Sequence, residues 1–175
     1  MMDFIGAPQI TALVILAQRG LEDLHSARNT RRLLADGGHE TGREYYPVVM
    51  VAHLAWIAAI FLLIPPGAEV IWPLIGLYAA LQAPRYWVIL TLGPYWTHRI
   101  ITPRDGPVVT QGPFRIVRHP NYLVLMLETA LLPLAFGAWA VSLVTTAVMG
   151  VVLYYKILLE DQALAARIEE KAASP

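Results

Sequence analysis

The chain contains no cysteine, which excludes disulfides, thiolate zinc sites and a cysteine nucleophile. Charged residues are also scarce: they make up 15% of the 175 residues, whereas a soluble domain usually carries about 25%. Acids and bases balance to a formal net charge of zero, so no global charge points to a nucleic-acid partner. Hydrophobic residues reach 57% of the chain, and this composition indicates an integral membrane protein.

Several motifs with a defined chemistry are missing as well. The sequence has no glycine-rich dinucleotide loop, no P-loop, no nucleophile elbow and no pair of histidines spaced as helical metal ligands. We therefore expect no metal site. The opening residues, MMDFIGAPQI, contain an acid and no basic stretch, so we do not expect a cleaved signal peptide.

The apolar residues gather in five segments that are able to cross or deeply enter a bilayer: residues 4–17, 46–64, 70–92, 120–136 and 139–159. Only a short corner separates the last two segments, which predicts a helical hairpin. We expect one all-α membrane domain over residues 1–175, with N-terminal helices over 1–92 and the functional core over 93–175.

Apart from Arg85 within the third apolar segment, the basic residues lie in three stretches of the chain: Arg19, Arg28, Arg31, Arg32 and Arg43; then Arg99, Arg104, Arg115 and Arg118; then Lys156, Arg167 and Lys171. The connectors at 65–69 and 137–138 contain none. Because loops rich in Lys and Arg stay in the cytoplasm, we expect the N-terminus outside and the C-terminus and functional loops inside. Residues 18–40 are predicted to form an interfacial helix on anionic headgroups, and residues 93–117 a loop that contains a short β-hairpin at 107–114.

The stretch Gly112 to Tyr122, GPFRIVRHPNY, leads directly into the fourth apolar segment. Pro120 favours the first helical position, which makes His119 the N-cap. A helix N-terminus carries partial positive charge, and Arg115 and Arg118 add to it. This end therefore suits an anion such as a carboxylate or a phosphate. Simple anchoring of the helix by basic residues is the alternative.

Glu128 lies roughly 12 Å into the same helix at ~1.5 Å per residue, where an ionised carboxylate is costly unless it is paired, hydrated or protonated. Arg85 in the third segment and His53 in the second lie at a similar depth. These three residues are candidate catalytic groups of a shared cavity that opens to the cytoplasmic side. An Arg85–Glu128 pair that only holds helices together is the alternative.

A second polar cluster lies where the fifth segment leaves the bilayer. Lys156 and Glu160 are spaced i, i+4, and Asp161 is adjacent. Acids placed in this way bind hydroxyl groups or an ammonium, although an ordinary solvated helix end has the same spacing.

The motif GPFRIVRHPNY, followed further along the chain by KILLEDQAL, resembles the isoprenylcysteine carboxyl methyltransferase family. The wider group of small membrane methyltransferases also includes phospholipid N-methyltransferases, and RYWVILTLGPYWTHR in the third segment is similar to the family as well. The N-terminal half, with QRGLEDLHSARNTRRLLADGGHE, resembles a bacterial subgroup that is often encoded beside type III polyketide synthases and methylates alkylpyrones or alkylresorcinols. The resemblance covers nearly the whole chain and implies a protein of the bacterial inner membrane.

The resemblance further implies that the protein binds S-adenosylmethionine on the cytoplasmic face and methylates a lipophilic acceptor reached from the membrane lipids. The residues implied to contact the cofactor are Val108, Val109, Phe114, Arg118, His119, Pro120, Asn121, Tyr122 and Glu160. Their chemistry agrees with this role: a helix N-terminus suits the carboxylate, Glu160 the ribose hydroxyls or the ammonium, and Phe114 the adenine.

The chain departs from the prenylcysteine enzymes at one position. Where they have an arginine one helical turn before the glutamate, a residue implied to handle the substrate carboxylate, this chain has Lys156. Lys156 is therefore the fourth candidate catalytic residue, although lysine lacks the bidentate fork that a carboxylate prefers. Together with Glu128, which is not expected in those enzymes, Lys156 favours a hydroxyl or enol acceptor that needs a base, with Glu128 or His53 as the candidate.

Other functions stay open at this point. Prenylcysteine-type carboxylates and phospholipid amines are the alternative acceptors. Sterol reductases share a similar helical architecture and use NADPH, but this short chain has no further basic cluster for a 2′-phosphate. A membrane scaffold or small transporter without a cofactor is the non-enzymatic alternative.

Overall fold

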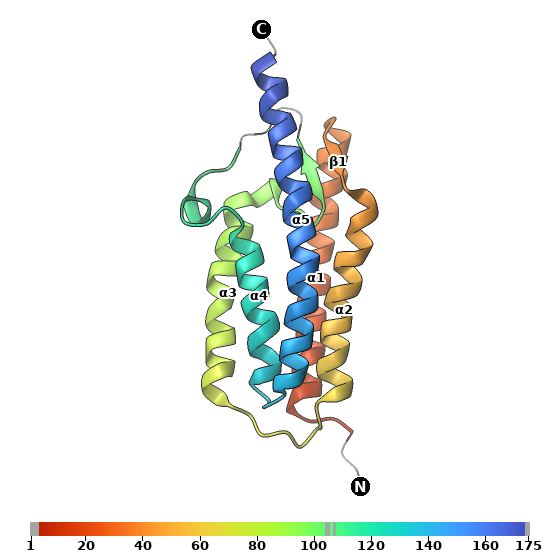
Figure 1. Cartoon of the computed structure of the whole chain (residues 1–175), viewed down its shortest axis with the longest axis vertical. Coiled ribbons are helices and arrows are strands. Elements are labelled where there is room, and N and C mark those ends of the chain that lie inside the picture. The colour runs from red at the N-terminus through yellow and green to blue at the C-terminus, as the bar shows by residue number, and fades with distance from the viewer. Residues whose placement is uncertain (1–3, 104–105, 107, 174–175) are drawn as a thin grey trace.

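The computed structural model describes residues 4–103, 106 and 108–173, so Arg104 lies outside the described residues. The elements are the helices α1 (Ala7–Ala35), α2 (Tyr46–Leu63), α3 (Trp72–Leu92), α4 (Pro120–Leu134) and α5 (Trp139–Ala173), and the strands β1 (His39–Thr41) and β2 (Ile100–Thr102). The helices stand side by side in one bundle, with the N-terminus at one end and the C-terminus at the other (Figure 1). Four helices therefore match the apolar segments predicted for them.

Proline marks the start of the first four helices. Pro8, Pro47, Pro73 and Pro120 each lie in the first turn of α1, α2, α3 and α4 in that order. A proline there loses no hydrogen bond, because the N–H groups of the first turn have no partner within the helix. The last two helices form the expected hairpin, and Gly137 turns the corner between them with a φ of 69°.

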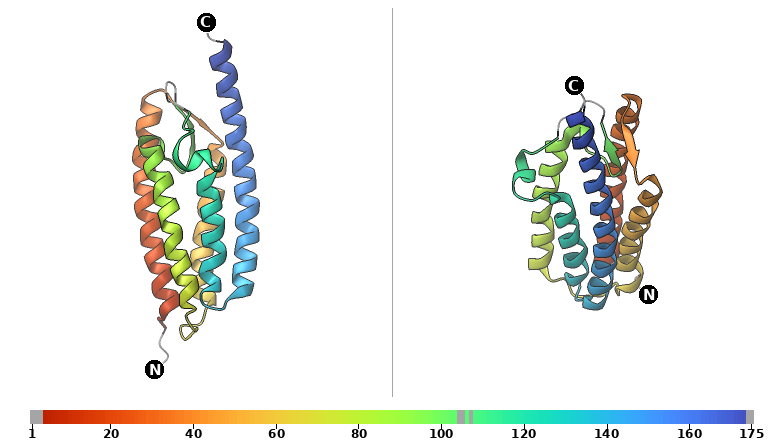
Figure 2. Two further views of the ribbon diagram at one scale, coloured as in Figure 1. Left: turned by 90° about the vertical axis from the view of Figure 1, so that its left-hand side faces the viewer. Right: turned by 45° about the horizontal axis from the view of Figure 1, so that its top comes forward.

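The apolar core fills the end of the bundle that lies near the N-terminus. It joins Ala12 and Ile15 of α1 with Trp56 and Ile60 of α2 and Leu132 of α4, all at most 3% exposed. The opposite end carries the loops, the small sheet and the last turns of α5, which extend past the other helices (Figure 2). Apolar side chains thus fill one end of the bundle, and the polar loops cover the other end.

The prediction that residues 4–40 form two separate segments is wrong. Residues 7–35 form one continuous helix, so the separate membrane segment at 4–17 and the interfacial helix at 18–40 do not exist as such. Arg19, Glu22, Ser26 and Asn29 are buried against the other helices, whereas Leu21 and Leu24 are exposed. The polar residues at spacings of three and four form the inward face, because they find buried partners across the bundle.

Strand pairing also differs from the prediction. No strand forms in the described part of residues 107–114. Instead His39–Thr41 pairs antiparallel with Ile100–Thr102, with Glu40 opposite Ile101. The pairing holds the loop after α3 against the segment between α1 and α2.

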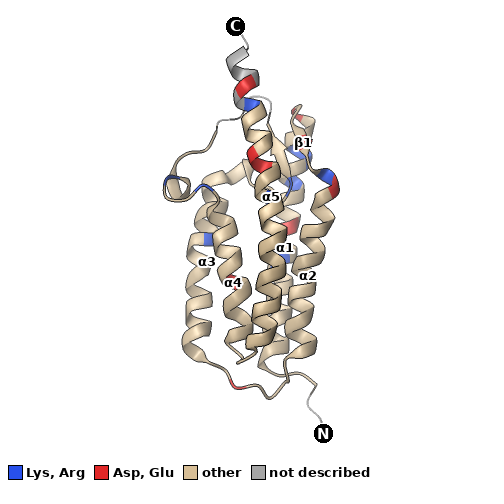
Figure 3. Cartoon of the chain, in the orientation of Figure 1, with Lys and Arg blue, Asp and Glu red and all other residues tan. Residues whose placement is uncertain are grey.

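Two helical stretches of the described residues are long and apolar enough to cross a membrane: Arg43–Leu63 and Trp139–Arg167. The helix Pro120–Leu134 is apolar but shorter. Charged residues concentrate in the half of the bundle that carries the loops and the C-terminus, and the other half is nearly free of them (Figure 3). This distribution is that of a membrane protein with one polar end.

Candidate functional site

The polar end of the bundle contains two adjoining cavities. The first, here the loop cavity, lies between the loop after α3, the start of α4 and the outer turns of α5, and holds about 1190 Å³ of unfilled space, part of it open to the surroundings. The second, here the bundle cavity, lies deeper between α1, α2, α4 and α5 and holds about 740 Å³. Because both volumes include space that is open to the surroundings, the residues that line each cavity, and not its volume, indicate what it could bind.

All of the residues that the sequence assigns to cofactor binding line the loop cavity: Val108, Val109, Phe114, Arg118, His119, Pro120, Asn121, Tyr122 and Glu160. They come from two parts of the chain, because residues 108–122 approach the outer part of α5 across the cavity. Aromatic and apolar side chains share this cavity with cations and carboxylates. The arrangement is suited to a ligand that has both a flat apolar part and charged ends.

The first turn of α4 is bound to α5 by a small charged cluster. His119 is the N-cap, and its ring lies 3.5 Å (Nδ1) from a Glu160 carboxylate oxygen and 3.2 Å (Nε2) from one of Asp161. The hydroxyl of Tyr122 donates to Glu160 at 2.7 Å, and the rings of His119 and Tyr122 stack with their centroids 5.5 Å apart. A cation, two carboxylates and a helix N-terminus therefore face one cavity.

The hydrogen bond to Glu160, with the negative charges of Glu160 and Asp161, raises the pKa of His119 above its usual 6.5, against a smaller opposing effect of burial. A raised pKa extends the pH range over which the imidazole is cationic. In its protonated form His119 adds a positive charge to the N-terminal end of the α4 dipole.

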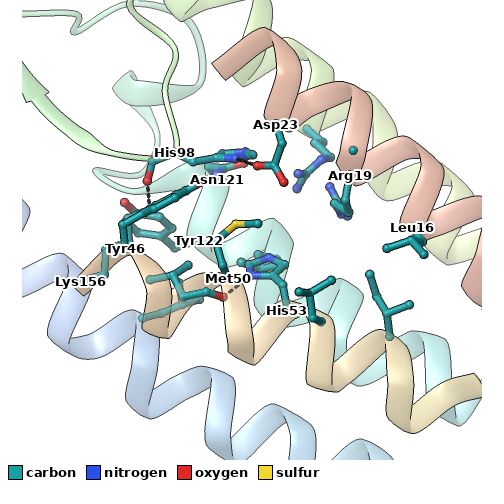
Figure 4. Close-up of a pocket in the computed structure, with 17 residues that line it drawn as sticks. Leu16, Arg19, Asp23, Tyr46, Met50, His53, His98, Asn121, Tyr122 and Lys156 are labelled. Atoms are coloured by element: carbon teal, nitrogen blue, oxygen red, sulfur yellow. Dashed lines mark hydrogen bonds and ion pairs between the residues drawn. The ribbon is translucent and has the colours of Figure 1, made fainter. Parts of the chain in front are cut away.

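The bundle cavity is mainly apolar, with a polar rim. Its apolar lining consists of Leu16, Val49, Met50, Leu54, Ile57, Leu125 and Leu153, and its polar lining of Arg19, Asp23, Tyr46, His53, Arg85, His98, Asn121, Tyr122 and Lys156. Figure 4 shows side chains from α1, α2, α4 and α5 pointing into this space. Such a wall suits an apolar molecule with one polar group.

The two cavities meet at Asn121 and Tyr122, which line both. The side-chain oxygen of Asn121 is buried and has no hydrogen-bond partner among the described residues. Lys156 braces the junction from α5, because its ammonium donates to the backbone oxygen of His98 at 2.8 Å and lies 5.3 Å from the centre of the Tyr122 ring. A buried acceptor without a hydrogen bond lowers the stability of the folded state, and a donor on a bound ligand would remove this loss.

A general base has to line the cavity that holds the acceptor, and Glu128 does not. The residue is fully buried and lines neither cavity. Arg19 donates to it at 2.7 Å, Arg85 at 3.3 Å and Gln82 at 2.8 Å. Both arginines also bind Glu22. Two cations and two carboxylates thus form one neutral buried cluster that joins α1, α3 and α4.

His53 and Arg85, the other catalytic candidates, line the bundle cavity together with Lys156. Nδ1 of His53 donates to the carbonyl oxygen of Val49, 3.0 Å away on the preceding turn of α2. Arg85 is 2% exposed and is engaged by the two carboxylates. The structure therefore brings three of the four catalytic candidates to one cavity and separates Glu128 from it.

Sequence reasoning missed the contribution of α1 to this site. Arg19 and Asp23 line the bundle cavity, and Glu22 binds Arg85. His98, in the loop after α3, was also missed, and its Nδ1 lies 2.6 Å from a carboxylate oxygen of Asp23. The available signal was the polar spacing of three and four along residues 19–29, which is typical of a buried helix face.

Comparison with known proteins shows the family of the chain. The model of the isoprenylcysteine carboxyl methyltransferase family matches residues 74–166, which include α4, most of α3 and α5 and the loop cavity. The uncharacterized protein YpbQ of Bacillus subtilis (strain 168) is 28% identical over 155 residues, which cover 86% of this chain and 92% of that protein. No solved structure matches the chain significantly.

Proposed function

The chain belongs to the isoprenylcysteine carboxyl methyltransferase family, and on that premise we propose that it is a membrane methyltransferase that uses S-adenosylmethionine and methylates a hydroxyl group of a lipophilic acceptor. The observation that carries the proposal is the pair of cavities that meet at Asn121 and Tyr122. One has the mixed polarity that the cofactor needs, and the other has the apolar wall that the acceptor needs.

The residues of the loop cavity fit S-adenosylmethionine. The protonated His119 and the positive end of the α4 dipole suit the carboxylate, and Glu160 suits the ammonium or the ribose hydroxyls. Phe114 suits the adenine. The unpaired side-chain oxygen of Asn121 is an acceptor for which the structure supplies no donor among the described residues. When bound, the cofactor supplies an electrophilic methyl group.

The charges around the bundle cavity favour a neutral acceptor. Its three cations are already engaged: Arg19 and Arg85 by Glu22 and Glu128, and Lys156 by the carbonyl oxygen of His98. A carboxylate would have to displace one of these partners, and an ammonium would find only Asp23 in the lining to balance its charge, a carboxylate that is already bound to His98. A weakly acidic hydroxyl avoids both costs, so alkylpyrones and alkylresorcinols are the proposed acceptors and a polyketide synthase pathway their proposed source.

Binding and turnover by the protein purified in detergent test this proposal. We expect S-adenosylmethionine to bind in calorimetry, and labelled methyl to pass from it to pentadecylresorcinol or a long-chain alkylpyrone. A farnesylated cysteine analogue and phosphatidylethanolamine are the competing acceptors. Exclusive methylation of either would contradict the hydroxyl acceptor, and absence of cofactor binding would favour a scaffold or transporter.

A further inference from the structure

His98 and Asp23 form a carboxylate–imidazole pair at the rim of the bundle cavity (Figure 4). The distance from His98 Nδ1 to Asp23 Oδ1 is 2.6 Å. An ionised carboxylate only accepts, so Nδ1 carries the proton and donates it, and Nε2 keeps its lone pair. Nε2 has no hydrogen-bond partner among the described residues, whereas the backbone of His98 is fixed on both sides: its N–H donates to Ser26 Oγ at 2.7 Å and its carbonyl oxygen accepts from Lys156.

The segment that carries His98 is part of the wall between the two cavities. Trp96, Thr97 and Arg99 line the loop cavity, and His98 lines the bundle cavity. Lys156 connects this segment to Tyr122, which lines both. The imidazole therefore lies on the acceptor side of the wall, beside the place where the acceptor and the methyl donor have to meet.

Two other groups compete for the role of base. Glu128 is enclosed by Arg19 and Arg85 and does not contact the cavity. His53 lines the cavity, but its Nδ1 is bound only to a backbone carbonyl oxygen. A carboxylate partner stabilises the imidazolium that forms when a histidine takes a proton, and a carbonyl does so less. Of the three groups, His98 therefore has the best geometry for general-base work.

We propose that His98 is the general base of the methyl transfer and that Asp23 is the residue that orients it; this deepens the proposed function and rests on it. The acceptor hydroxyl gives its proton to Nε2 of His98, and the acceptor oxygen forms a bond to the methyl carbon. The carbon–sulfur bond breaks with its electron pair remaining on sulfur. A weakly acidic hydroxyl needs the His98–Asp23 pair, because its proton has to be removed. A carboxylate acceptor needs no base, because it is already ionised.

The charges around His98 are compatible with this role. Burial and the cations Lys156 of α5 and Arg85 of α3 lower the pKa of His98 below its usual 6.5, while Asp23 of α1 raises it by a smaller amount. A lowered pKa leaves the imidazole neutral at pH 7, which is the form that accepts a proton.

The test compares His98→Gln and Asp23→Asn with the wild type on pentadecylresorcinol. We expect His98→Gln to lower turnover about 10²-fold or more and Asp23→Asn to lower it by part of that factor, with the dissociation constant of S-adenosylmethionine unchanged. His25→Gln is the matched control, because His25 stacks on Trp96 beside the same loop and lines neither cavity. It should keep wild-type turnover.

Acceptors of different acidity distinguish a general base from a residue that only supports the structure. A nitrated alkylresorcinol that is already ionised at the assay pH needs no base, so the ratio of wild-type to His98→Gln turnover should fall towards one. The wild-type rate should also decline as the pH falls through the pKa of His98, which is lowered below its usual 6.5, and this decline should be absent in His98→Gln. A ratio that stays constant across acceptors of different acidity would overturn the assignment. It would also be overturned if His53→Gln, and not His98→Gln, lost turnover in a way that depends on acceptor acidity.

Failure of the inference and failure of the proposed function give different results. If the wild type bound no S-adenosylmethionine, the proposed function would be wrong, and the inference with it. If the wild type methylated pentadecylresorcinol and His98→Gln did so at the same rate, the proposed function would stand and the inference alone would be wrong.

Discussion

His119 combines two tasks in a single side chain: it begins α4, and it holds a positive charge beside Glu160 and Asp161. The raised pKa of this histidine follows from those two carboxylates. The same carboxylates compete with any anion for the imidazole. We therefore expect a ligand carboxylate to bind there only while His119 keeps its proton.

The first prediction concerns affinity for S-adenosylmethionine. His119→Ala should weaken binding by a factor of about ten or more, the loss of one charge-assisted hydrogen bond of about 1.5–3 kcal/mol. Because the pKa of His119 is raised, its contribution is full below about pH 6.5 and is lost as the pH rises through the raised value. Calorimetry from pH 6 to 9 checks both points. An equally steep decline of affinity with pH in His119→Ala would contradict them.

The second prediction concerns Glu128, which sequence reasoning placed among the catalytic groups. Glu128→Gln removes one of two carboxylates that face Arg19 and Arg85. Because an uncompensated buried charge remains, the free energy of unfolding should fall by about 3–5 kcal/mol. Denaturant unfolding in detergent measures this loss, with the exposed Glu69→Gln between α2 and α3 as a control expected to stay within about 0.5 kcal/mol. A stable Glu128→Gln protein that lost turnover would restore Glu128 as the base.

At the scale of elements, local signals were sufficient for four helices and insufficient for α1. Prolines and apolar runs placed the start of α2, α3 and α4 because these signals act within one turn of the chain. The inward face of α1 is polar over residues 19–29, and its partners are Arg85 and Glu128, far along the sequence. A pattern that depends on such partners reads as a surface helix until the partners are known.

The candidate site also contains residues that local sequence signals predict and residues that they do not. The residues of the loop cavity include a contiguous motif at the start of α4, so they were predictable together. His98 and Asp23, by contrast, are 75 positions apart. They meet where α1 holds the loop after α3: Asn29 donates to the carbonyl oxygens of Gly93 and Trp96, and Ser26 accepts from the N–H of His98. No local spacing encodes that contact.

The third prediction concerns the junction of α1 and α2 at the apolar end. The amide of Gln9 donates to the carbonyl oxygens of Phe61 and Ile64 at 2.9 and 2.8 Å, and so satisfies acceptors that α2 leaves open at its C-terminus. Gln9→Leu should lower the free energy of unfolding by about 1–3 kcal/mol, because these carbonyl groups lie where little water reaches them. Thermal unfolding in detergent measures this. Ile10→Val on the exposed face of the same turn is the control, and equal stability of the two variants would contradict the explanation.

At the scale of the whole molecule, polarity and position in the bundle coincide. The apolar core occupies one end, the buried ionic cluster lies above it, and the loop cavity lies among the loops at the other end, with the bundle cavity between the helices beside it. The basic residues that the structure describes lie toward that same end (Figure 3). A lipophilic acceptor would reach the bundle cavity from the membrane, and a charged cofactor would reach the loop cavity from water.

The fourth prediction is the orientation that this distribution implies. Loops rich in Lys and Arg stay in the cytoplasm, so the loops around Asp36 and Thr110 should be cytoplasmic and Gly67, in the connector after α2, should face outward. Because the chain has no cysteine, Gly67→Cys, Asp36→Cys and Thr110→Cys each introduce the only thiol. All three positions are exposed, and a side chain at Gly67 would meet open space. Gly106 and Gly38 are poor sites by comparison, since a Cβ there would come within 2.5 Å of Pro103 and 2.6 Å of the Leu33 carbonyl oxygen respectively.

An impermeant maleimide applied to intact cells whose outer membrane has been made permeable should label Gly67→Cys only, and the other two variants only after lysis. The inverse pattern would reverse the topology and place both cavities outside, where S-adenosylmethionine is not made. Labelling of all three variants in intact cells would mean that the bundle does not separate two compartments. Activity measured on the same three variants shows whether each label reports on the folded protein, because a cysteine at any of these exposed positions should leave turnover unchanged.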